Sequence, residues 1–265
     1  SLAGERNPID ERNYLYHADR VLIGGHRGSA CRYPENSIEA MEHGLLSGAD
    51  YLEIDIQLTR DGVPVVYHDT ALEKRTALHG YVHEHTLDRL RENCPGLCTF
   101  EEAMRWGSER EAWFALEIKT VPLDMQEVNF RLLEAMVPVL EKTGMKKRVF
   151  VFGPDYQVLK RMKQLDPEVE IGLIVPFIPE DPVELMKSMD AMVYLTYIYN
   201  ITPDMIDGLK AHGYYVSGAI LREEKWMERA NACGVTMFEA DYPEMARRLG
   251  SAGRQSGRNS EGCEL

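Results

Sequence analysis

The chain has 265 residues, and 44% of them are hydrophobic, so it is long enough to bury a large core. Its formal net charge is -13 at pH 7, from 43 acidic and 30 basic residues. This charge argues against general binding to nucleic acids or to anionic membranes, because those partners select basic surfaces. An anionic ligand therefore needs a local group of positive side chains.

The cysteines are odd in number and scattered, which indicates reduced thiols rather than a disulfide framework. They are Cys31, Cys94, Cys98, Cys233 and Cys263. No segment reaches the ~18 apolar residues of a membrane-spanning helix, and the N-terminus is charged, so we expect no stable membrane insertion. We expect a cytoplasmic location, although a start at Ser1 leaves room for a removed leader.

The first segment, residues 1–20, is polar and lacks clear periodicity, and we interpret it as an arm that packs on the domain after it. Val21–Gly25 has the composition of a buried strand. Pro34 precedes a helix that we expect over Glu35–Ser47, because apolar residues recur there at helical spacing. Gly48 ends this helix.

The second predicted strand, Asp50–Gln57, carries Glu53 and Asp55 on one face, because side chains alternate along a strand. Two neighbouring carboxylates resist burial unless a cation lies between them. The alternative is an edge strand with its acidic face in water. Polar residues at the ends of the neighbouring predicted strands favour the cation.

A turn at Asp61-Gly62 leads into a short strand-like segment over Val63–Tyr67. Residues 69–98 are polar and irregular, and we interpret them as an insertion over one end of the domain. A helix follows from Thr99, and regular alternation begins there. Further strands are expected at Ala112–Ile118, Arg148–Phe152, Glu170–Val175, Ala191–Leu195, Tyr214–Ala219 and Val235–Glu239. Helices are expected between and after them, at Leu123–Lys142, Tyr156–Leu165, Pro182–Ser188, Pro203–His212, Glu223–Cys233 and Pro243–Leu249.

Eight strand-helix units in series predict parallel strands joined by crossover helices, and eight is the number that closes into a barrel. We therefore expect an α/β fold, a (β/α)8 TIM barrel in one domain over residues 21–249, with the small insertion after the second strand. An open, doubly wound sheet is the alternative. The tail over residues 250–265 is rich in Gly, Ser and Arg and is expected to be disordered.

Chemically versatile side chains lie at the carboxyl ends of the first three barrel strands, where a barrel places its active site. They are His26, Arg27, Glu53, Asp55, Glu117 and Lys119. The three carboxylates offer only oxygen ligands, which suit a hard divalent cation such as Mg²⁺ or Ca²⁺. With one such ion bound, Arg27 and Lys119 make the site net positive, which suits a phosphate group.

Two histidines fall on the same rim, His26 after the first strand and His68 after Val65-Val66. A lone histidine is usually structural. Near neutral pH, however, a pair of imidazoles can act as base and acid, which in-line displacement at phosphorus requires. The pair beside an acidic cluster therefore predicts an enzyme that carries out displacement at phosphorus.

The chain resembles the glycerophosphodiester phosphodiesterase family in a dense, ordered set of motifs. They are His26-Arg-Gly28, Pro34-Glu-Asn36, Gly48-Ala-Asp50, Glu53-Ile-Asp55, Thr59-Arg-Asp-Gly62, His68-Asp69, Glu117-Ile-Lys119 and Asp241-Tyr-Pro243. The resemblance implies a barrel with an insertion after the second strand. It also implies metal-dependent hydrolysis of a small-molecule glycerophosphodiester to glycerol 3-phosphate and an alcohol.

The resemblance also implies the roles of individual residues. His26 and His68 are the expected acid/base pair. Glu53, Asp55 and Glu117 are the expected ligands of one divalent cation. Arg27 and Lys119 are expected to bind the phosphate, with Glu35 and Asn36 supporting the site. In the family, the glycerol 2-hydroxyl is thought to attack phosphorus, which gives a cyclic phosphate that water opens.

Departures from the family pattern leave the substrate open. Ala219-Ile-Leu-Arg222 stands where many members read Trp-Thr-Val-Asn, and Gly153-Pro154 stands where members often carry Ser-Phe. Tyr194, Tyr197 and Tyr199 follow the sixth strand and are candidate walls of an altered pocket. One alternative is a phospholipase D-type enzyme acting on lysolipids or sphingolipids, which predicts an apolar, exposed entrance. The other is a non-catalytic phosphodiester-binding barrel.

Overall fold

The computed structural model describes residues 21–28, 34–120, 126–221 and 223–241. The expected N-terminal arm, the helix at Pro243–Leu249, the tail over 250–265 and Cys31 lie outside these ranges.

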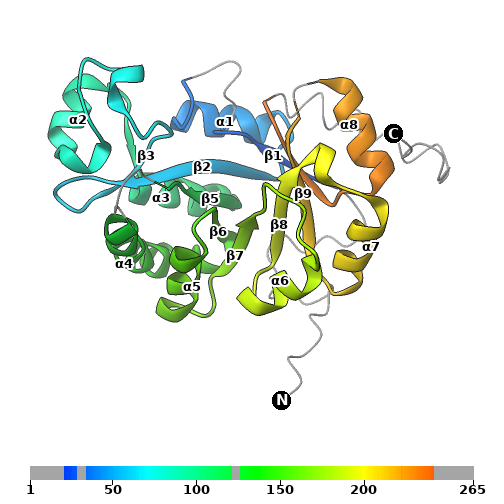
Figure 1. The fold of residues 1–265 in the computed structure, drawn as a ribbon. Coiled ribbons are helices and arrows are strands. Elements are labelled where there is room, and N and C mark those ends of the chain that lie inside the picture. Colours follow the sequence, from blue (N-terminus) through cyan, green and yellow to red (C-terminus); the bar gives the residue numbers. More distant parts are fainter. Residues whose placement is uncertain (1–20, 29–33, 121–125, 222, 242–265) are drawn as a thin grey trace.

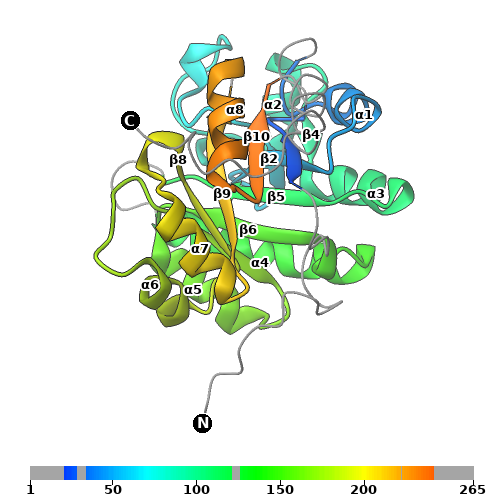
Figure 2. The same ribbon diagram turned by 90° about the vertical axis from the view of Figure 1, so that its right-hand side faces the viewer.

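A closed barrel of eight parallel strands forms the centre of the molecule (Figure 1). The closure is made by the first and last strands, which pair in parallel from Leu22 opposite Met237 to Gly25 opposite Ala240. Figure 2 shows these two segments side by side although they come from opposite ends of the chain. The barrel strands are β1 Leu22–Gly25, β2 Tyr51–Leu58, β5 Phe114–Ile118, β6 Val149–Gly153, β7 Glu170–Ile174, β8 Val193–Tyr197, β9 Tyr215–Leu221 and β10 Met237–Ala240. The predicted (β/α)8 barrel is confirmed, and the open sheet is wrong because β1 also pairs with β2.

Helices connect successive barrel strands and cover the outside of the barrel (Figure 1). They are α1 Ile38–Leu46, α3 Phe100–Arg110, α4 Gln126–Thr143, α5 Tyr156–Leu165, α6 Pro182–Met189, α7 Pro203–Ala211 and α8 Glu224–Cys233. Among the described residues, we find no helix with the length and apolar character needed to cross a bilayer.

The first helix begins at Ile38, three residues later than predicted. The hydroxyl of Ser37 accepts a hydrogen bond from the backbone N–H of Ala40 and so caps the helix. Asn36, just before this cap, has a φ of 58°, which no helix accommodates. The predicted start at Glu35 is therefore wrong, and Glu35 and Asn36 belong to the loop above the barrel.

Alternation along each strand divides the core into two layers. The outward side chains of β2, Leu52, Ile54 and Ile56, are buried against the helices. Inside the barrel, Tyr51, Phe150 and other apolar residues form a second cluster that fills the lower interior. The charged positions of the interior, such as Glu53, Asp55 and Glu239, lie above this apolar cluster, toward the carboxyl ends of the strands.

The segment after β2 contains more regular structure than the sequence predicts. It leaves the barrel through β3 Pro64–Val66, which pairs antiparallel with the end of β2, and returns through β4 Cys98–Thr99. Between them lie two short 3-10 helices, η1 Leu72–Lys74 and η2 Val82–Glu84, and α2 Leu87–Asn93, coloured cyan in Figure 1. A small apolar core of its own, which includes Leu72, Val82 and Leu90, holds this insertion together.

The cysteines differ from the expectation at one position. Cys94 and Cys98 are free, but Cys233 at the end of α8 is disulfide-bonded. The prediction of reduced thiols is therefore wrong for Cys233, because spacing in the sequence does not report which thiols the fold brings together.

Candidate active site

A cavity of about 400 Å³ opens at the carboxyl ends of β3 and β5. Its lining includes His68 and Asp69 on one side and Glu117 and Lys119 on the other. Polar and charged groups thus surround a space large enough for a small molecule, at the end of the barrel where the sequence predicts the site.

Three carboxylates from two neighbouring strands meet beside this cavity. Glu53 and Asp55 of β2 are 1% and 0% exposed, and Glu117 of β5 is paired directly opposite Asp55. One oxygen from each carboxylate lies within 4.8 Å of the other two. The structure therefore brings together all three predicted metal ligands.

Burial of these acids has an electrostatic cost. Burial, followed by the charges of Asp55, Glu239 and Glu117, raises the pKa of Glu53 well above its ordinary value. Burial and the charge of Glu117 likewise raise the pKa of Asp55. For Glu117, burial acts most strongly and would raise the pKa, but the ammonium of Lys119 and the hydrogen bonds with Asp55, Lys119 and Glu53 together outweigh it and leave the pKa lowered.

The three acids fit a divalent cation. Among the described residues, Oε1 of Glu53 and Oδ1 of Asp55 are buried and accept no hydrogen bond. Lys119 lies close, with Nζ 3.5 Å from Oδ1 of Asp55 and 3.2 Å from Oε1 of Glu117. One ammonium does not balance three carboxylates, and oxygen ligands alone favour a hard ion. A divalent ion would supply the missing positive charge.

His26 follows β1 and is held by a carboxylate from the other end of the chain. Its Nδ1 lies 2.7 Å from Oδ1 of Asp241, which comes directly after β10. Its Nε2 lies 3.8 Å from Oε2 of Glu53. With Nδ1 as the proton donor to Asp241, Nε2 is left as the reactive nitrogen beside the acidic group.

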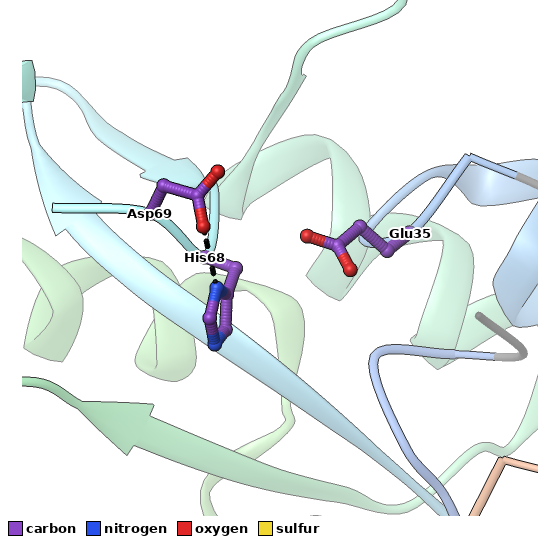
Figure 3. A group of neighbouring side chains, drawn as sticks. All are labelled: Glu35, His68 and Asp69. Atoms are coloured by element: carbon purple, nitrogen blue, oxygen red, sulfur yellow. Dashed lines mark hydrogen bonds and ion pairs between the residues drawn. The ribbon is translucent and has the colours of Figure 1, made fainter. Parts of the chain in front are cut away.

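His68 has the same kind of partner on the opposite side of the site. Its Nδ1 lies 2.8 Å from Oδ1 of the adjacent Asp69 (Figure 3), and its Nε2 closely contacts the guanidinium of Arg27. Burial lowers the pKa of His68, and the positive charges of Lys119 and Arg27 lower it further. The hydrogen bond with Asp69 acts in the opposite direction but does not cancel these effects. The imidazole is consequently neutral at neutral pH.

Glu35 also faces this side of the site. In Figure 3 its carboxylate points toward His68 and Asp69 across a gap. The guanidinium of Arg75 spans the gap, with NH1 2.6 Å from Oε1 of Glu35 and Nε 2.9 Å from Oδ2 of Asp69. Arg27 contacts the other Glu35 oxygen at 2.6 Å. Glu35, His68 and Asp69 also lie within 4.8 Å of one another, but two guanidinium groups already balance their carboxylates. The group on β2 and β5 is therefore the better cation site.

A tight turn after β1 presents His26 and Arg27. Gly28 has a φ of 84°, and a Cβ on Gly25 would lie 2.1 Å from the carbonyl oxygen of Gly28, so both positions require glycine. Arg27 itself has a φ of 50°, and its backbone N–H donates to Oε2 of Glu53 at 3.0 Å. The turn therefore orients both functional side chains and one carboxylate.

Asn36 ties the loop after β1 to the acidic strand. Its Nδ2 donates to Oδ2 of Asp55 and its Oδ1 accepts from the backbone N–H of Asp55, both at 3.2 Å. This double contact fixes the Asp55 carboxylate. Asn36 thus lies behind the carboxylate of Asp55.

Four charged residues of the site were given no role in the sequence analysis: Asp69, Arg75, Glu239 and Asp241. Asp69 and Asp241 belong to motifs that support the family resemblance, but the sequence does not show that each carboxylate contacts a histidine. Glu239 has an inward position on β10, and burial followed by the charges of Glu117 and Asp55 raises its pKa to about 8. Strand alternation alone could have found it. Arg75 lies in the insertion, and no local pattern distinguishes it from Lys74.

The three tyrosines in and just after β8 separate into two groups. Tyr194 is 1% exposed and belongs to the outer core, so it does not line the pocket. Tyr197 and Tyr199 are exposed and stack on each other. Of the segment 219–222 that departs from the family pattern, residue 222 lies outside the described ranges.

Carboxylates, imidazoles and ammonium and guanidinium groups at the carboxyl end of a (β/α)8 barrel define an enzyme of the barrel class. The chain belongs to the Glycerophosphoryl diester phosphodiesterase family, which matches residues 26–245. The resemblance is therefore confirmed, and the chain is a phosphoric diester hydrolase of a metal-dependent family.

Individual relatives and structures agree with this assignment. A glycerophosphodiester phosphodiesterase from Caldanaerobacter subterraneus subsp. tengcongensis is 26% identical over 85% of this chain and 96% of its own length. The human lysophospholipase D GDPD1 is 24% identical over 84% of this chain and 83% of its own. A phosphodiesterase from Oleispira antarctica, solved with the product sn-glycerol-3-phosphate, has a TM-score of 0.79 at 24% identity and covers 87% of this chain and 96% of its own. At this identity the structural likeness establishes the fold.

Proposed function

We propose that this chain hydrolyses glycerophosphodiesters to glycerol 3-phosphate and an alcohol, with one Mg²⁺ or Ca²⁺ ion held by Glu53, Asp55 and Glu117. The observation that carries the proposal is the meeting of these three carboxylates, two of them buried, beside two histidines that are each paired with a carboxylate of their own. The product bound to the Oleispira antarctica enzyme supports the same reaction.

The charges of the site suit a phosphodiester. Three carboxylates and a divalent ion leave one negative charge, which the ammonium of Lys119 cancels. The guanidinium groups of Arg27 and Arg75 likewise balance Glu35 and Asp69. Arg27 offers a planar pair of donors and Lys119 a point charge, so the two can hold different phosphate oxygens. A bound cation supplies further stabilisation of the negative charge that develops on those oxygens.

The histidines supply proton transfer in this scheme. One Nε2 removes the proton of the glycerol 2-hydroxyl as its oxygen bonds to phosphorus, and the other histidine donates a proton to the departing alcohol oxygen. The resulting cyclic phosphate is opened by water with the two proton transfers reversed. Asp241 and Asp69 keep each Nδ1 protonated, so that each Nε2 can accept or return a proton.

Hydrolysis of lysolipids by the same site is the second candidate. It is supported by the exposed tyrosine pair at the end of β8 and by the lysophospholipase D activity in the name of the human relative. The non-catalytic barrel has less support, because a binding module has no need for two imidazole-carboxylate pairs beside a cation site.

One assay tests these proposals. The purified chain is incubated with glycerophosphocholine or with lysophosphatidylcholine, each with Mg²⁺, with Ca²⁺ or with a chelator, and glycerol 3-phosphate and choline are measured. We expect glycerol 3-phosphate from glycerophosphocholine, and no product with the chelator. Choline from lysophosphatidylcholine alone would favour the second candidate. Absence of turnover on both substrates, with either ion, would contradict the proposed function.

A further inference from the structure

Exposed apolar side chains gather in two loops of the barrel. Five large hydrophobic residues are exposed within the described part of the chain, and four of them lie at or just after the carboxyl ends of β7 and β8. Phe177 and Ile178 are 55% and 67% exposed, and Tyr197 and Tyr199 are 46% and 64% exposed. We call these four residues the aromatic patch.

The two loops are joined into one surface. The hydroxyl of Thr196 donates to the carbonyl oxygen of Val175 at 2.6 Å, and Nδ2 of Asn200 donates to that of Pro176 at 3.3 Å. The rings of Tyr197 and Tyr199 stack at 5.1 Å between centroids. The patch is thus held in place by contacts of its own, rather than being a pair of independent loops.

The aromatic patch lies at the catalytic end of the molecule. Both of its loops follow the carboxyl ends of parallel barrel strands, and the acidic site lies at the same ends of β2 and β5. The fifth exposed residue, Leu46, ends α1 shortly before β2 begins, which places it at the amino ends of the strands. Exposure of large apolar side chains is therefore concentrated where substrate enters.

The charges beside the patch restrict what it can contact. Residues 175–204 contain a single basic side chain, that of Lys187 within α6, whereas Glu180, Asp181 and Asp204 directly flank the two loops. These carboxylates, with the net charge of -13, repel an anionic surface. A zwitterionic choline lipid instead presents a quaternary ammonium outermost, which suits both carboxylates and tyrosine rings.

We propose that the aromatic patch docks this enzyme on the surface of zwitterionic, choline-bearing lipid aggregates, with the mouth of the barrel turned toward the head groups. Tyrosine rings favour the boundary between water and lipid, because one end of the ring is apolar and the other is polar. Phe177 and Ile178 enter the apolar side of that boundary. Docking brings the site to diesters that are embedded in the surface.

The binding test uses the full chain and sedimentation with vesicles of phosphatidylcholine or phosphatidylglycerol. We expect binding to phosphatidylcholine that exceeds binding to phosphatidylglycerol. The double variant Phe177→Ser, Ile178→Ser should lose about tenfold or more of the vesicle partition coefficient, whereas the control Leu46→Ser should keep it. No binding to phosphatidylcholine, stronger binding to phosphatidylglycerol or an equal loss in both variants would overturn the proposal.

A second readout separates docking from the proposed function, on which its role in catalysis rests. Both variants should hydrolyse glycerophosphocholine at the rate of the unmodified chain, since Phe177 and Ile178 do not line the site cavity. Vesicle binding without hydrolysis would contradict the proposed function and leave docking intact. Hydrolysis without vesicle binding would contradict docking and leave the proposed function intact. Gel filtration tests whether a second copy of the chain occupies the patch instead. If the unmodified chain is a dimer that does not bind vesicles, and the double variant is a monomer, the patch is a dimer interface and the proposal is overturned.

Discussion

The Nδ1 atom of His26 lies 2.7 Å from Oδ1 of Asp241, although 215 positions separate the two residues. They meet because β1 and β10 pair and close the barrel, so that the residue after each strand lies beside the other. The first histidine of the site is therefore oriented only when the ring is complete. This relationship leads to the first prediction.

Replacement Asp241→Asn should lower kcat by about 10²-fold or more, because the amide no longer fixes the Nδ1–H tautomer of His26. Binding of Mg²⁺ or Ca²⁺, measured by calorimetry, should be unchanged, since the expected ligands stay in place. His26→Ala should show a loss at least as large. Full activity in Asp241→Asn would exclude a positioning role for this carboxylate.

Arg75 is expected to be a positioning residue, because its guanidinium bridges Glu35 and Asp69 and so holds the partner of His68. Arg75→Lys should lower kcat about tenfold or more with little change in KM, since one ammonium cannot replace a two-sided fork. The matched control is Lys74→Gln: Lys74 is 65% exposed and lies 3.7 Å from the same aspartate. Equal losses of kcat at both positions would mean that Arg75 acts only through its positive charge and not by positioning Asp69.

The location of the cation is tested by comparing two glutamates. Glu53→Gln should weaken Mg²⁺ or Ca²⁺ binding about tenfold or more in a calorimetric titration, because it removes one anionic ligand. Glu35→Gln is the control, since Glu35 belongs to the other acidic group, where Arg27 and Arg75 already balance the charge. Loss of binding in Glu35→Gln alone would place the ion beside His68 instead.

The lowered pKa of His68 predicts the pH dependence of folding in the metal-free chain. The unfolded imidazole titrates near its ordinary pKa of 6.5, above the folded one, so the unfolded chain binds the proton more readily. Stability is therefore lost as the pH falls from about 6.5 toward the folded pKa. His68→Gln should lose less stability than the unmodified chain in denaturant titrations between about pH 7.5 and pH 5.5.

The control for this titration is His79→Gln, because the side chain of His79 is 89% exposed. This variant should follow the unmodified chain. A nuclear magnetic resonance titration of the His68 ring gives the direct measurement, and a midpoint above 6.5 would contradict the expected direction.

Much of the site can be predicted from the sequence, because strand alternation is a local property. Glu53 and Asp55 share one face of their strand wherever that strand lies in the molecule. Because the opposite face is apolar and packs against the helices, the acidic face points into the barrel. The same rule applies to Glu117 and Lys119. The insertion was predicted less well, since its helix and small core depend on contacts such as Leu72 with Leu90 that no periodicity reports.

The sequence by itself determined the eight barrel strands and the helices between them, the acidic strand faces and the identity of the histidines, since each depends on periods of a few residues. Only the tertiary structure decided which carboxylate orients which histidine, that Arg75 bridges Glu35 and Asp69, and that four exposed apolar side chains share one end of the barrel. These relationships join distant parts of the chain. They follow from closure of the ring and from the folding of its loops, which no local pattern encodes.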